Sequence, residues 1–508
     1  MQTILMVLLA VVVLIATFVV RRLFSLHKIH SKIKHIPGVM QVFELSPIRI
    51  PFLSTHLYLT SDEDLDKACL LYGDAETQTL SIATSTTPLV FISDPKMLKE
   101  YFITKGHLFE KPGYEVVNFF GEDNILTATN TEKWKKHYKI CSAAFTPKNL
   151  MYVCKVADKS CDLLFEIWNE RLKENGSMIL DVNEYSNLTL DVLGKAAFNI
   201  DFGFYSNNEE GRYFRQSMEK LISPQAVLSF AFFGNIPFLF KLANRVMGVQ
   251  AATDHCSDYL DKIIEQRKKL LSTGEILDTD EGSDLLTLLV GANVKEETIT
   301  NNQLKSNTLL LSTAGHETTA KTLSWVSYRL SKHPEIQSKL WKEVDEVLQG
   351  RNPTYADLPS LPYVNAIITE SLRLNPPVYH LGRIATKNLT LGKYDIPKGT
   401  MVQAFMSRVQ QREDIWENAK EFIPERFLDP KVKDSYQHNF TYAAFSLGNR
   451  QCLGKHFAIL EAATILCKLA QKYEFKLLND ESVDPVGVFK LPVAKPTSNM
   501  KVQVSLRK

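Results

Sequence analysis

The sequence lacks the marks of several common protein classes. No two of its cysteines form a C-x-x-C pair, which argues against a zinc site or a disulfide framework and favours a reducing compartment. We find no internal repeat, no low-complexity tract and no linker between two folding units, so we expect the 508 residues to form one large body. The formal net charge is only +2, and we expect no nucleic-acid partner. The seven cysteines are Cys69, Cys141, Cys154, Cys161, Cys256, Cys452 and Cys467.

Long hydrophobic runs are scarce, with one exception at the N-terminus. Thr3 to Val20 are uncharged and mostly apolar, and as a helix they would span about 27 Å, close to the hydrocarbon core of a bilayer. Arg21 and Arg22 follow, so the positive-inside rule places the rest of the chain in the cytosol. A cleaved signal peptide is the alternative, but the run is too long and no positive region precedes it. We expect a transmembrane anchor over 1–22, a basic, proline-containing lead-in over 23–52 and the main domain over 53–508.

The spacing of apolar residues predicts a fold that is mainly α with small β-sheets. Apolar positions three and four residues apart indicate helices, and alternating β-branched residues indicate short strands. Residues 410–444 show few periodic apolar positions, so we expect a mostly irregular segment there. The predicted helices span 96–102, 150–175, 183–199, 298–332, 335–348 and 361–374, and the predicted strands lie within 78–92 and 383–408.

The stretch from Leu221 to Val249 is unusually apolar, but Pro224, Gly234 and Pro237 interrupt it too often for a membrane span. One interpretation is a loop in the protein core. The other is a hydrophobic lobe that dips into the bilayer surface and admits apolar substrates. The sequence leaves both open.

A loop near the C-terminus, from Phe445 to Gly454, holds a single cysteine between two glycines. Arg450 lies two residues before Cys452, and apolar residues at helical spacing follow from Phe457. Cys452 therefore precedes a helix N-terminus, where backbone N–H groups and the helix dipole favour a thiolate. Such a thiolate is either a nucleophile or a metal ligand, and the loop alone does not decide between them.

Three further clusters suggest chemistry, although each also has an ordinary interpretation. Residues 314–319, A-G-H-E-T-T, place a glycine, an acid and two threonines inside a predicted helix, where Gly costs about 1 kcal/mol relative to Ala. They form either a binding notch with a proton-relaying pair, Glu317 and Thr318, or an ordinary helix with a surface acid. Glu370 and Arg373 share a helix face and could form a surface ion pair. The third cluster, P-E-R-F, adds Arg426.

Together these motifs resemble the cytochrome P450 superfamily. Residues 445–454 match F-x-x-G-x-R-x-C-x-G, residues 314–319 match [AG]-G-x-[DE]-T-[TS], and E-x-x-R and P-E-R-F lie at 370–373 and 424–427. The order and spacing also fit, and the resemblance covers about residues 35–505. The N-terminal anchor and lead-in resemble those of the microsomal branch, which implies a single-pass protein of the endoplasmic reticulum membrane with a cytosolic catalytic domain.

The resemblance implies a role for each matching residue. Cys452 would be the thiolate ligand of haem b iron, where a thiolate favours O–O cleavage. Glu317 and Thr318 would deliver protons to bound dioxygen. Glu370, Arg373 and Arg426 would form a buried structural network. The remaining haem contacts would come from the notch, the cysteine loop and cations at the propionates: Ala314, Gly315, Phe445, Gly454, Arg450 and Arg383.

Two stretches depart from the family pattern. The family usually has W-x-x-x-R in an early helix, but here Trp134 is followed by Tyr138 at the arginine position. A tyrosine brings no charge to a haem propionate, so we expect weaker binding or help from His137. Gln410 to Glu413 replace a turn that reads like His-Arg-Asp-Pro in many members.

Lysines near the early helix raise the question of a redox partner. On the family arrangement, Lys133, Lys135, Lys136, Lys139 and Lys455 would lie on the thiolate side of the haem. They form either a solvated basic face or a docking surface for an acidic electron donor. The resemblance to the microsomal branch implies NADPH–cytochrome P450 reductase, with cytochrome b5 as an optional second donor.

The sequence therefore predicts a monooxygenase that inserts one atom of O2 into a lipophilic molecule, such as a fatty acid, sterol, terpenoid or xenobiotic, with electrons from NADPH. A haem-thiolate isomerase or dehydratase that needs no reductase is one alternative, although such relatives tend to lack the acid–alcohol pair. A non-catalytic haem-binding protein is another, and the complete Ala314–Thr319 motif argues against it.

Overall fold

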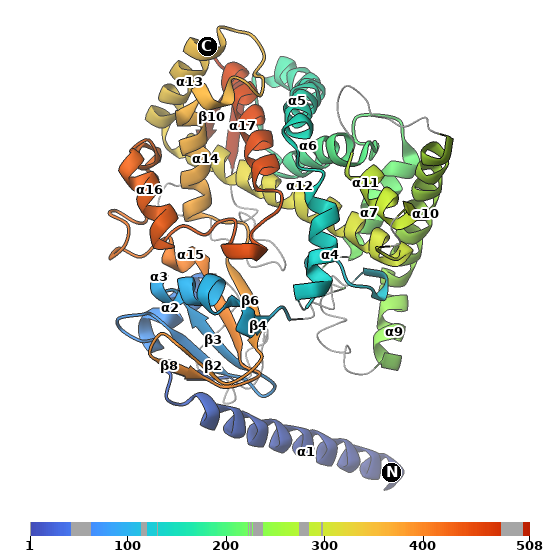
Figure 1. Cartoon of the computed structure of the whole chain (residues 1–508), viewed down its shortest axis with the longest axis vertical. Coiled ribbons are helices and arrows are strands. Elements are labelled where there is room, and N and C mark those ends of the chain that lie inside the picture. Colours follow the sequence, from blue (N-terminus) through green and yellow to red (C-terminus); the bar gives the residue numbers. More distant parts are fainter. Residues whose placement is uncertain are drawn as a thin grey trace.

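The structure is a computed structural model that describes residues 2–41, 62–112, 119–129, 131–221, 223, 226, 237–273, 284–295, 298–478 and 501–508. Most of these residues are helical (Figure 1). The helices are α1 (Gln2–Ile33), α2 (Asp62–Tyr72), α3 (Pro95–Lys99), α4 (Thr131–Ser142), α5 (Pro147–Asn175), α6 (Asn183–Leu193), α7 (Glu209–Leu221), α9 (Pro237–Val246), α10 (Val249–Thr273), α11 (Leu285–Lys295), α12 (Asn301–Lys332), α13 (Pro334–Leu348), α14 (Pro362–Leu374), α15 (Met406–Val409), α16 (Pro430–Asn439) and α17 (Lys455–Lys472).

The strands form small sheets at two places in the molecule. The larger sheet has the order β1-β2-β3-β9-β6-β4, a second has the order β10-β11-β5, and β7 and β8 form a hairpin. The expected strands within 78–92 and 383–408 are confirmed. The strands are β1 (Gly38–Met40), β2 (Leu80–Ala83), β3 (Pro88–Ile92), β4 (Phe109–Glu110), β5 (Ser177–Ile179), β6 (His380–Ala385), β7 (Leu389–Leu391), β8 (Tyr394–Ile396), β9 (Met401–Phe405), β10 (Tyr473–Leu477) and β11 (Val502–Leu506).

Helix α12 is the central element of the fold. It crosses the middle of the molecule between the helices of the upper end and the larger sheet below (Figure 1). Thr300 and Gln303 close its N-terminus with a capping box, and it ends at His333, before Pro334. Most of its side chains are buried on every face, which is typical of a helix in the core of a large domain.

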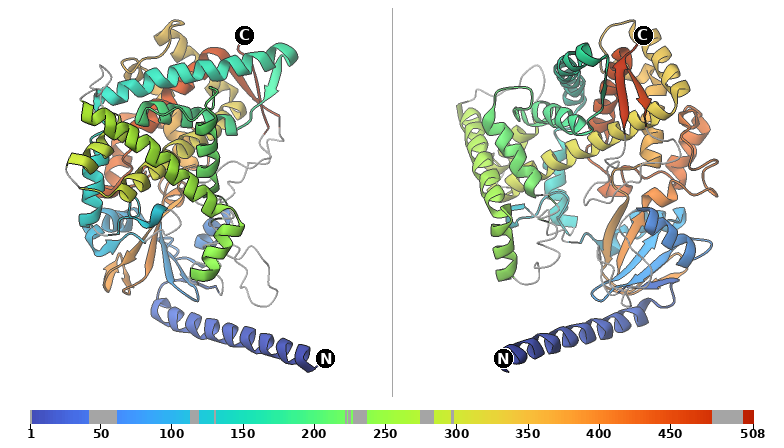
Figure 2. Two further views of the ribbon diagram at one scale, coloured as in Figure 1. Left: turned by 90° about the vertical axis from the view of Figure 1, so that its right-hand side faces the viewer. Right: turned by 180° about the vertical axis from the view of Figure 1, so that it is seen from behind.

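Helix α1 runs from Gln2 to Ile33 without interruption and lies across the lower end of the molecule (Figures 1 and 2). Leu26, Ile29 and Ile33 are buried against Ala83 at the end of β2. Among the residues that the structure describes, no helix is both long enough and apolar enough to cross a membrane.

One expectation from the sequence is confirmed, and others lie outside the described residues. Residues 410–444 are mostly irregular, but they include α16 and a 3-10 turn, η7 (Pro424–Phe427), that the sequence did not predict. Helix α16 has little apolar periodicity. Asp429 caps its N-terminus, and Tyr436 packs on Phe427 with ring centroids 5.2 Å apart. The last part of the expected lead-in, 42–52, and the middle of the apolar stretch, 227–236, lie outside the described residues.

Candidate functional site

The cysteine loop has a tightly constrained backbone. The Cys452 N–H donates to the Phe445 carbonyl at 2.8 Å, and Ser446 and Gly448 both have positive φ angles, 62° and 72°. A Cβ at Gly448 would lie 2.6 Å from the Phe102 carbonyl oxygen, so only glycine fits there. The loop continues through a 3-10 turn, η8 (Gly448–Arg450), and Gly454 precedes the first residue of α17.

The thiol of Cys452 is accessible, although the protein around it desolvates it. Burial raises the pKa of Cys452, and the Gly454 N–H and the Lys455 ammonium only partly offset this. The backbone at the helix N-terminus thus favours the thiolate as expected, but in the protein chain alone desolvation outweighs it. A thiol with a raised pKa is a poor nucleophile, whereas a bound metal cation deprotonates a coordinating thiol. This favours the ligand interpretation.

Helix α12 packs on α17 and carries Ala314 and Gly315, the residues of the predicted notch. Ala314 is exposed in the middle of a helix whose neighbouring turns are buried. A Cβ at Gly315 would lie 2.8 Å from Leu193 of α6, so glycine allows α6 and α12 to approach closely. Ala314 thus exposes surface within an otherwise buried helix, as the wall of an internal site would.

Glu317 and Thr318 follow the notch but differ in what holds them. The Thr318 hydroxyl donates to the Ala314 carbonyl at 3.0 Å. The Glu317 carboxylate lies 2.9 Å from the Lys321 ammonium and 3.4 Å from His316 Nε2, and it accepts a hydrogen bond from Ser186. Burial would raise the pKa of Glu317, but His316 and Lys321 hold it well below its usual range. Glu317 is therefore ionised at neutral pH.

Three enclosed cations converge near the cysteine loop. Arg450 lies 4.6 Å above the Trp134 ring, and Arg383 lies 5.2 Å from the centroid of Tyr101. Lys111 is the third. Burial and the charges of Arg383 and Arg450 lower the pKa of Lys111 to about 7, and burial and Arg383 lower the pKa of Arg450 to about 10.

Sequence reasoning missed Lys111. Strand β4 pairs antiparallel with β6, so that Glu110 opposes Ile384, and the next residues in this register are Lys111 and Arg383. The register joins segments more than 270 residues apart, and nothing in the local sequence around Lys111 indicates it.

Tyr138 and His137 of α4, the early helix that departs from the family pattern, lie in different environments. Tyr138 is 39% exposed and packs on Trp134, with ring centroids 4.8 Å apart. His137 is buried, and its Nδ1 lies 2.8 Å from Nδ2 of Asn307. Burial lowers the pKa of His137 to about 4, so it is neutral at pH 7 and offers a carboxylate a hydrogen-bond donor at most.

Glu370, Arg373 and Arg426 come together in one buried network. Arg373 donates to both carboxylate oxygens of Glu370, at 2.7 and 2.8 Å, and Arg426 Nε donates to Glu370 at 3.1 Å. The side chains of Glu370 and Arg373 are fully buried, which excludes the surface-pair interpretation. The remaining Arg373 donors reach the carbonyls of Gln410, Ala419 and Glu421.

Gln410, in the second divergent stretch, connects this network to the cysteine loop. It is fully buried, and its amide donates to the Arg373 carbonyl at 3.0 Å. Its Oε1 accepts from the Ala443 N–H at 2.8 Å. An amide can donate to α14 and accept from the segment before Phe445 at the same time, so Gln410 serves as a cross-link in this turn.

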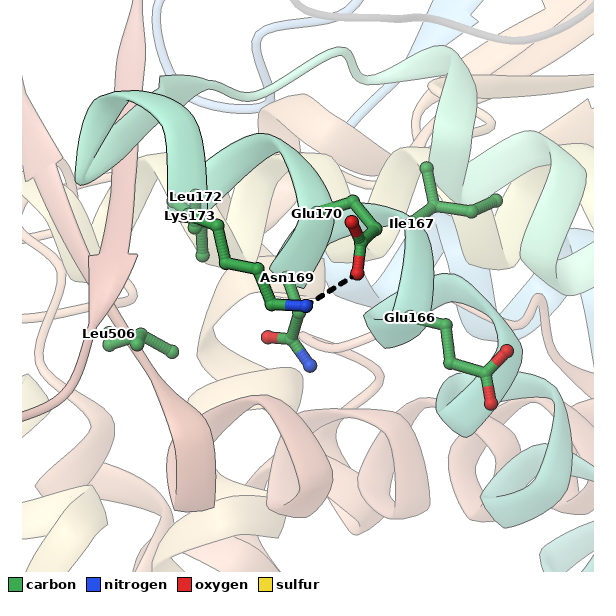
Figure 3. Close-up of a pocket in the computed structure, with 7 residues that line it drawn as sticks. All are labelled: Glu166, Ile167, Asn169, Glu170, Leu172, Lys173 and Leu506. Atoms are coloured by element: carbon green, nitrogen blue, oxygen red, sulfur yellow. Dashed lines mark hydrogen bonds and ion pairs between the residues drawn. The ribbon is translucent and has the colours of Figure 1, made fainter.

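A surface pocket elsewhere holds none of the predicted site residues. Figure 3 shows it on α5 and β11, where Glu170 and Lys173 form an ion pair at 2.6 Å. Its lining residues are Glu166, Ile167, Asn169, Glu170, Leu172, Lys173 and Leu506.

Comparison with known proteins identifies the family. Residues 45–504 match the family described as Cytochrome P450. The chain is a cytochrome P450. Its relatives include an 11-oxo-beta-amyrin 30-oxidase of Medicago truncatula, 32% identical over 404 residues (77% of this chain and 74% of the relative), and secologanin synthase 1 of Catharanthus roseus, 31% identical over 401 residues (76% and 74%). Cytochrome P450 4c21 of Blattella germanica is 29% identical over 409 residues (77% and 79%).

This P450 belongs to a family of haem-thiolate monooxygenases that bind haem b through a cysteine and use O2, a redox partner and a lipophilic substrate. The residues present fit that cofactor. An accessible cysteine lies in a rigid loop, and three cations gather close by, as the two carboxylates of a haem require.

Proposed function

We propose that this P450 is a membrane-bound monooxygenase in which Cys452 is the axial haem ligand and Lys111, Arg383 and Arg450 bind the propionates. The observation that carries the proposal is that Cys452 is accessible in a constrained loop near these three converging cations. Burial lowers the pKa values of Lys111 and Arg450, and the charge of Arg383 adds to this effect; bound carboxylates would offset both. Trp134 supports Arg450 through its ring face.

The haem, when bound, supplies the activation of O2. The protein positions the substrate and delivers protons to the site. Thr318 offers a hydroxyl beside the exposed Ala314 surface. Glu317, held ionised by His316 and Lys321, can pass on a proton only after it has first received one. Phe445, Gly315 and Gly454 shape the two walls of the site, and His137 presents its Nε2–H while Nδ1 accepts from Asn307.

The test is spectroscopic. The reduced protein under carbon monoxide should show the red-shifted Soret band of thiolate-ligated haem, and Cys452→Ala should abolish it. Cys467→Ala is the matched control, because Cys467 is a buried cysteine on α17 and should leave the band unchanged. A normal band in Cys452→Ala would refute the assignment.

We also propose attachment to the endoplasmic reticulum membrane by a single N-terminal span, with the catalytic domain in the cytosol. The uncharged run Thr3–Val20 followed by two arginines supports this. Phe238, Leu242 and Val246 of α9 lie four residues apart on one helix face and are all exposed. Helix α9 lies at the same end of the molecule as α1 (Figures 1 and 2), which favours the lobe that dips into the bilayer over the core loop.

A terpenoid or another lipophilic molecule is the proposed substrate class. The names of two relatives, an 11-oxo-beta-amyrin oxidase and a secologanin synthase, support it. Product formation from a lipid and terpenoid panel, dependent on NADPH and reductase, tests it. Turnover without a reductase would favour the isomerase or dehydratase alternative.

The proposed electron donor is NADPH–cytochrome P450 reductase, with cytochrome b5 as a second. Acidic neighbours partly neutralise the lysines of the surface on which the electron donor would dock. Lys133 pairs with Asp123 at 2.8 Å, and Lys135 pairs with Glu132 at 3.0 Å. Lys136 and Lys139 are exposed on the same helix, α4.

A further inference from the structure

The imidazole ring of His316 is buried on α12 between a carbonyl group and a carboxylate. Its Nδ1 lies 2.7 Å from the Ser312 carbonyl oxygen, one turn earlier on the same helix. Its Nε2 lies 3.4 Å from Oε1 of Glu317. The Thr189 hydroxyl of α6 donates to the His316 carbonyl at 3.0 Å, which holds this turn of α12 against α6. Both ring nitrogens of His316 therefore face protein oxygens.

These two oxygens determine where the ring must carry hydrogen. A carbonyl oxygen only accepts hydrogen bonds, so Nδ1 is the donor to Ser312. A neutral ring with its hydrogen on Nδ1 would turn the Nε2 lone pair toward the Glu317 carboxylate, and two acceptors that face each other repel. The contact between His316 and Glu317 is favourable only when a proton lies between Nε2 and Oε1, bonded to one of the two atoms.

The other contacts of Glu317 decide which atom holds this proton at rest. The Lys321 ammonium lies 2.9 Å from Oε2, and the Ser186 hydroxyl of α6 donates to Oε1 at 3.3 Å. Both contacts favour the carboxylate over the carboxylic acid. Among the described residues, Lys321 is the only other ionisable side chain bonded to the pair, and α6 contributes hydroxyl groups alone. The proton therefore rests on His316, as an imidazolium beside a carboxylate.

The two side chains differ in their access to water. The Glu317 side chain is 23% exposed, whereas that of His316 is 3% exposed. Water can therefore reach the carboxylate, but the protein shields a proton on the ring. A monooxygenase reduces one oxygen atom of O2 to water, which consumes protons as well as electrons. An ionised Glu317 alone would have to wait for a proton from water, whereas a proton on the adjacent ring is already inside the protein.

We propose that His316 and Glu317 share one proton, which Nε2 of His316 holds at rest and transfers to Oε1 of Glu317 when the site consumes a proton. The inference deepens the proposed function and rests on the role given there to Glu317. The transfer breaks the Nε2–H bond and forms an Oε1–H bond, and no electrons move between the residues. The ring is left neutral, with Nδ1–H still donated to Ser312.

The pair is reloaded from the water side. Once Glu317 has passed its proton to the site, water at the exposed carboxylate supplies another, and this proton returns to Nε2 because Lys321 again favours the carboxylate. His316 contacts neither substrate nor cofactor in this scheme. It is a positioning residue that acts through Glu317, because it keeps a proton within one transfer of the acid.

The first experiment observes the proton directly. Nitrogen-15 magic-angle-spinning NMR is recorded on the full-length holoenzyme with labelled histidine, as the reduced carbon monoxide complex, which is diamagnetic. At about pH 8, where exposed histidines are mostly neutral, the parent should show an imidazolium signal that His316→Gln removes. Glu317→Gln should convert this signal to that of a neutral ring with hydrogen on Nδ1, because the carboxylate that stabilises the imidazolium is lost.

Thr189→Val is the matched control for this measurement. It removes a contact with the backbone carbonyl of His316 and leaves both ring contacts in place, so the imidazolium signal should persist. A neutral His316 ring in the parent, or an imidazolium that is unchanged in Glu317→Gln, would overturn the inference. The comparison of the parent with Glu317→Gln alters nothing at His316, so it remains decisive even if His316→Gln does not bind haem.

The second experiment measures the product formed per NADPH consumed as a function of pH, with the substrate that the lipid and terpenoid panel identifies. In the parent this ratio should fall over the pH range in which the imidazolium signal disappears. His316→Gln should lose this dependence and keep a low ratio at every pH, whereas Thr189→Val should retain it. A purely structural role for His316 would lower the ratio but preserve its pH dependence, and that result would overturn the inference.

The carbon monoxide spectrum separates this inference from the proposed function. A red-shifted Soret band in the parent together with a neutral His316 ring would refute the shared proton alone. Absence of that band in the parent would refute the haem-thiolate assignment, and the inference with it.

Discussion

Two groups of enclosed cations in this P450 differ in how their charge is balanced. Arg373 and Arg426 share the Glu370 carboxylate, and the Arg373 donors that remain reach backbone carbonyls. Arg383 and Arg450 instead lie against aromatic faces, and burial together with nearby positive charge lowers the pKa values of Lys111 and Arg450. The first group shares one buried carboxylate, whereas the second gathers three positive charges, which suits the proposed binding of the two haem carboxylates.

The largest expected effect comes from breaking the complete group. Glu370→Gln removes the anion and leaves two buried guanidinium groups, and it should lower the free energy of unfolding by about 3–5 kcal/mol. Denaturant unfolding and the yield of folded protein measure this. Glu425→Gln is the control, because Glu425 forms an exposed pair with Lys339 at 2.6 Å and should cost about 1 kcal/mol or less. An equal loss of unfolding free energy in the two variants would contradict the distinction between the buried Glu370 network and an exposed ion pair.

Removing a cation from the second group should weaken the retention of haem rather than destabilise the fold. Lys111→Met should speed the loss of haem to apomyoglobin by roughly 10–100-fold, as expected for one charge-assisted contact of about 1.5–3 kcal/mol. Lys105→Met is the nearby control, since Lys105 pairs with Glu100 at 2.8 Å on the surface. An unchanged rate for Lys111→Met would remove this lysine from the propionate site.

The same lysine predicts a pH dependence in the haem-free protein. Its pKa is about 7 in the folded chain against an ordinary 10.5, so between these values the unfolded chain binds more protons. The free energy of unfolding should therefore rise as the pH increases from about 7 to about 10. Lys111→Met should flatten this slope in denaturant titrations at several pH values. A slope that persists in the variant would assign the effect to another group.

A smaller effect is expected at the Ala314–Thr318 side of the site, where folding is not at stake. Thr318→Val removes the hydroxyl beside Ala314 and should lower the amount of product formed per NADPH consumed, because a proton-relaying group is lost. Thr322→Val is the matched control, because its hydroxyl makes the same bond one turn later, to the Thr318 carbonyl at 3.0 Å. Similar coupling in both variants would argue against a role for Thr318.

The smallest effect should come from the exposed lysines. Lys135→Glu with Lys136→Glu should slow reduction by the reductase without a change in haem content, and the effect should shrink as salt increases. Lys135 is already paired with Glu132, so most of the change should come from Lys136. Stopped-flow reduction of each single variant separates the two. Unchanged rates would favour the solvated basic face.

The motif residues could be predicted because their chemistry is local. Spacing alone puts Glu370 and Arg373 on one face of a helix and Cys452 before another. Spacing did not reveal that His316 and Lys321 hold Glu317 ionised, that Gln410 joins α14 to the segment before the cysteine loop, or that α16 forms around aromatic contacts. Those features depend on burial and on side chains that meet only when the chain is folded.

The sequence by itself determined the family, the thiol at Cys452, the acid–alcohol pair and the central helix, because each is written in residues a few positions apart. Only the tertiary structure decided the protonation of these groups and the partners of their charges. Desolvation raised the pKa of Cys452 against the helix dipole, and strand pairing brought Lys111 beside Arg383. The environment of a charge is set by segments distant in the chain, and a linear pattern does not contain it.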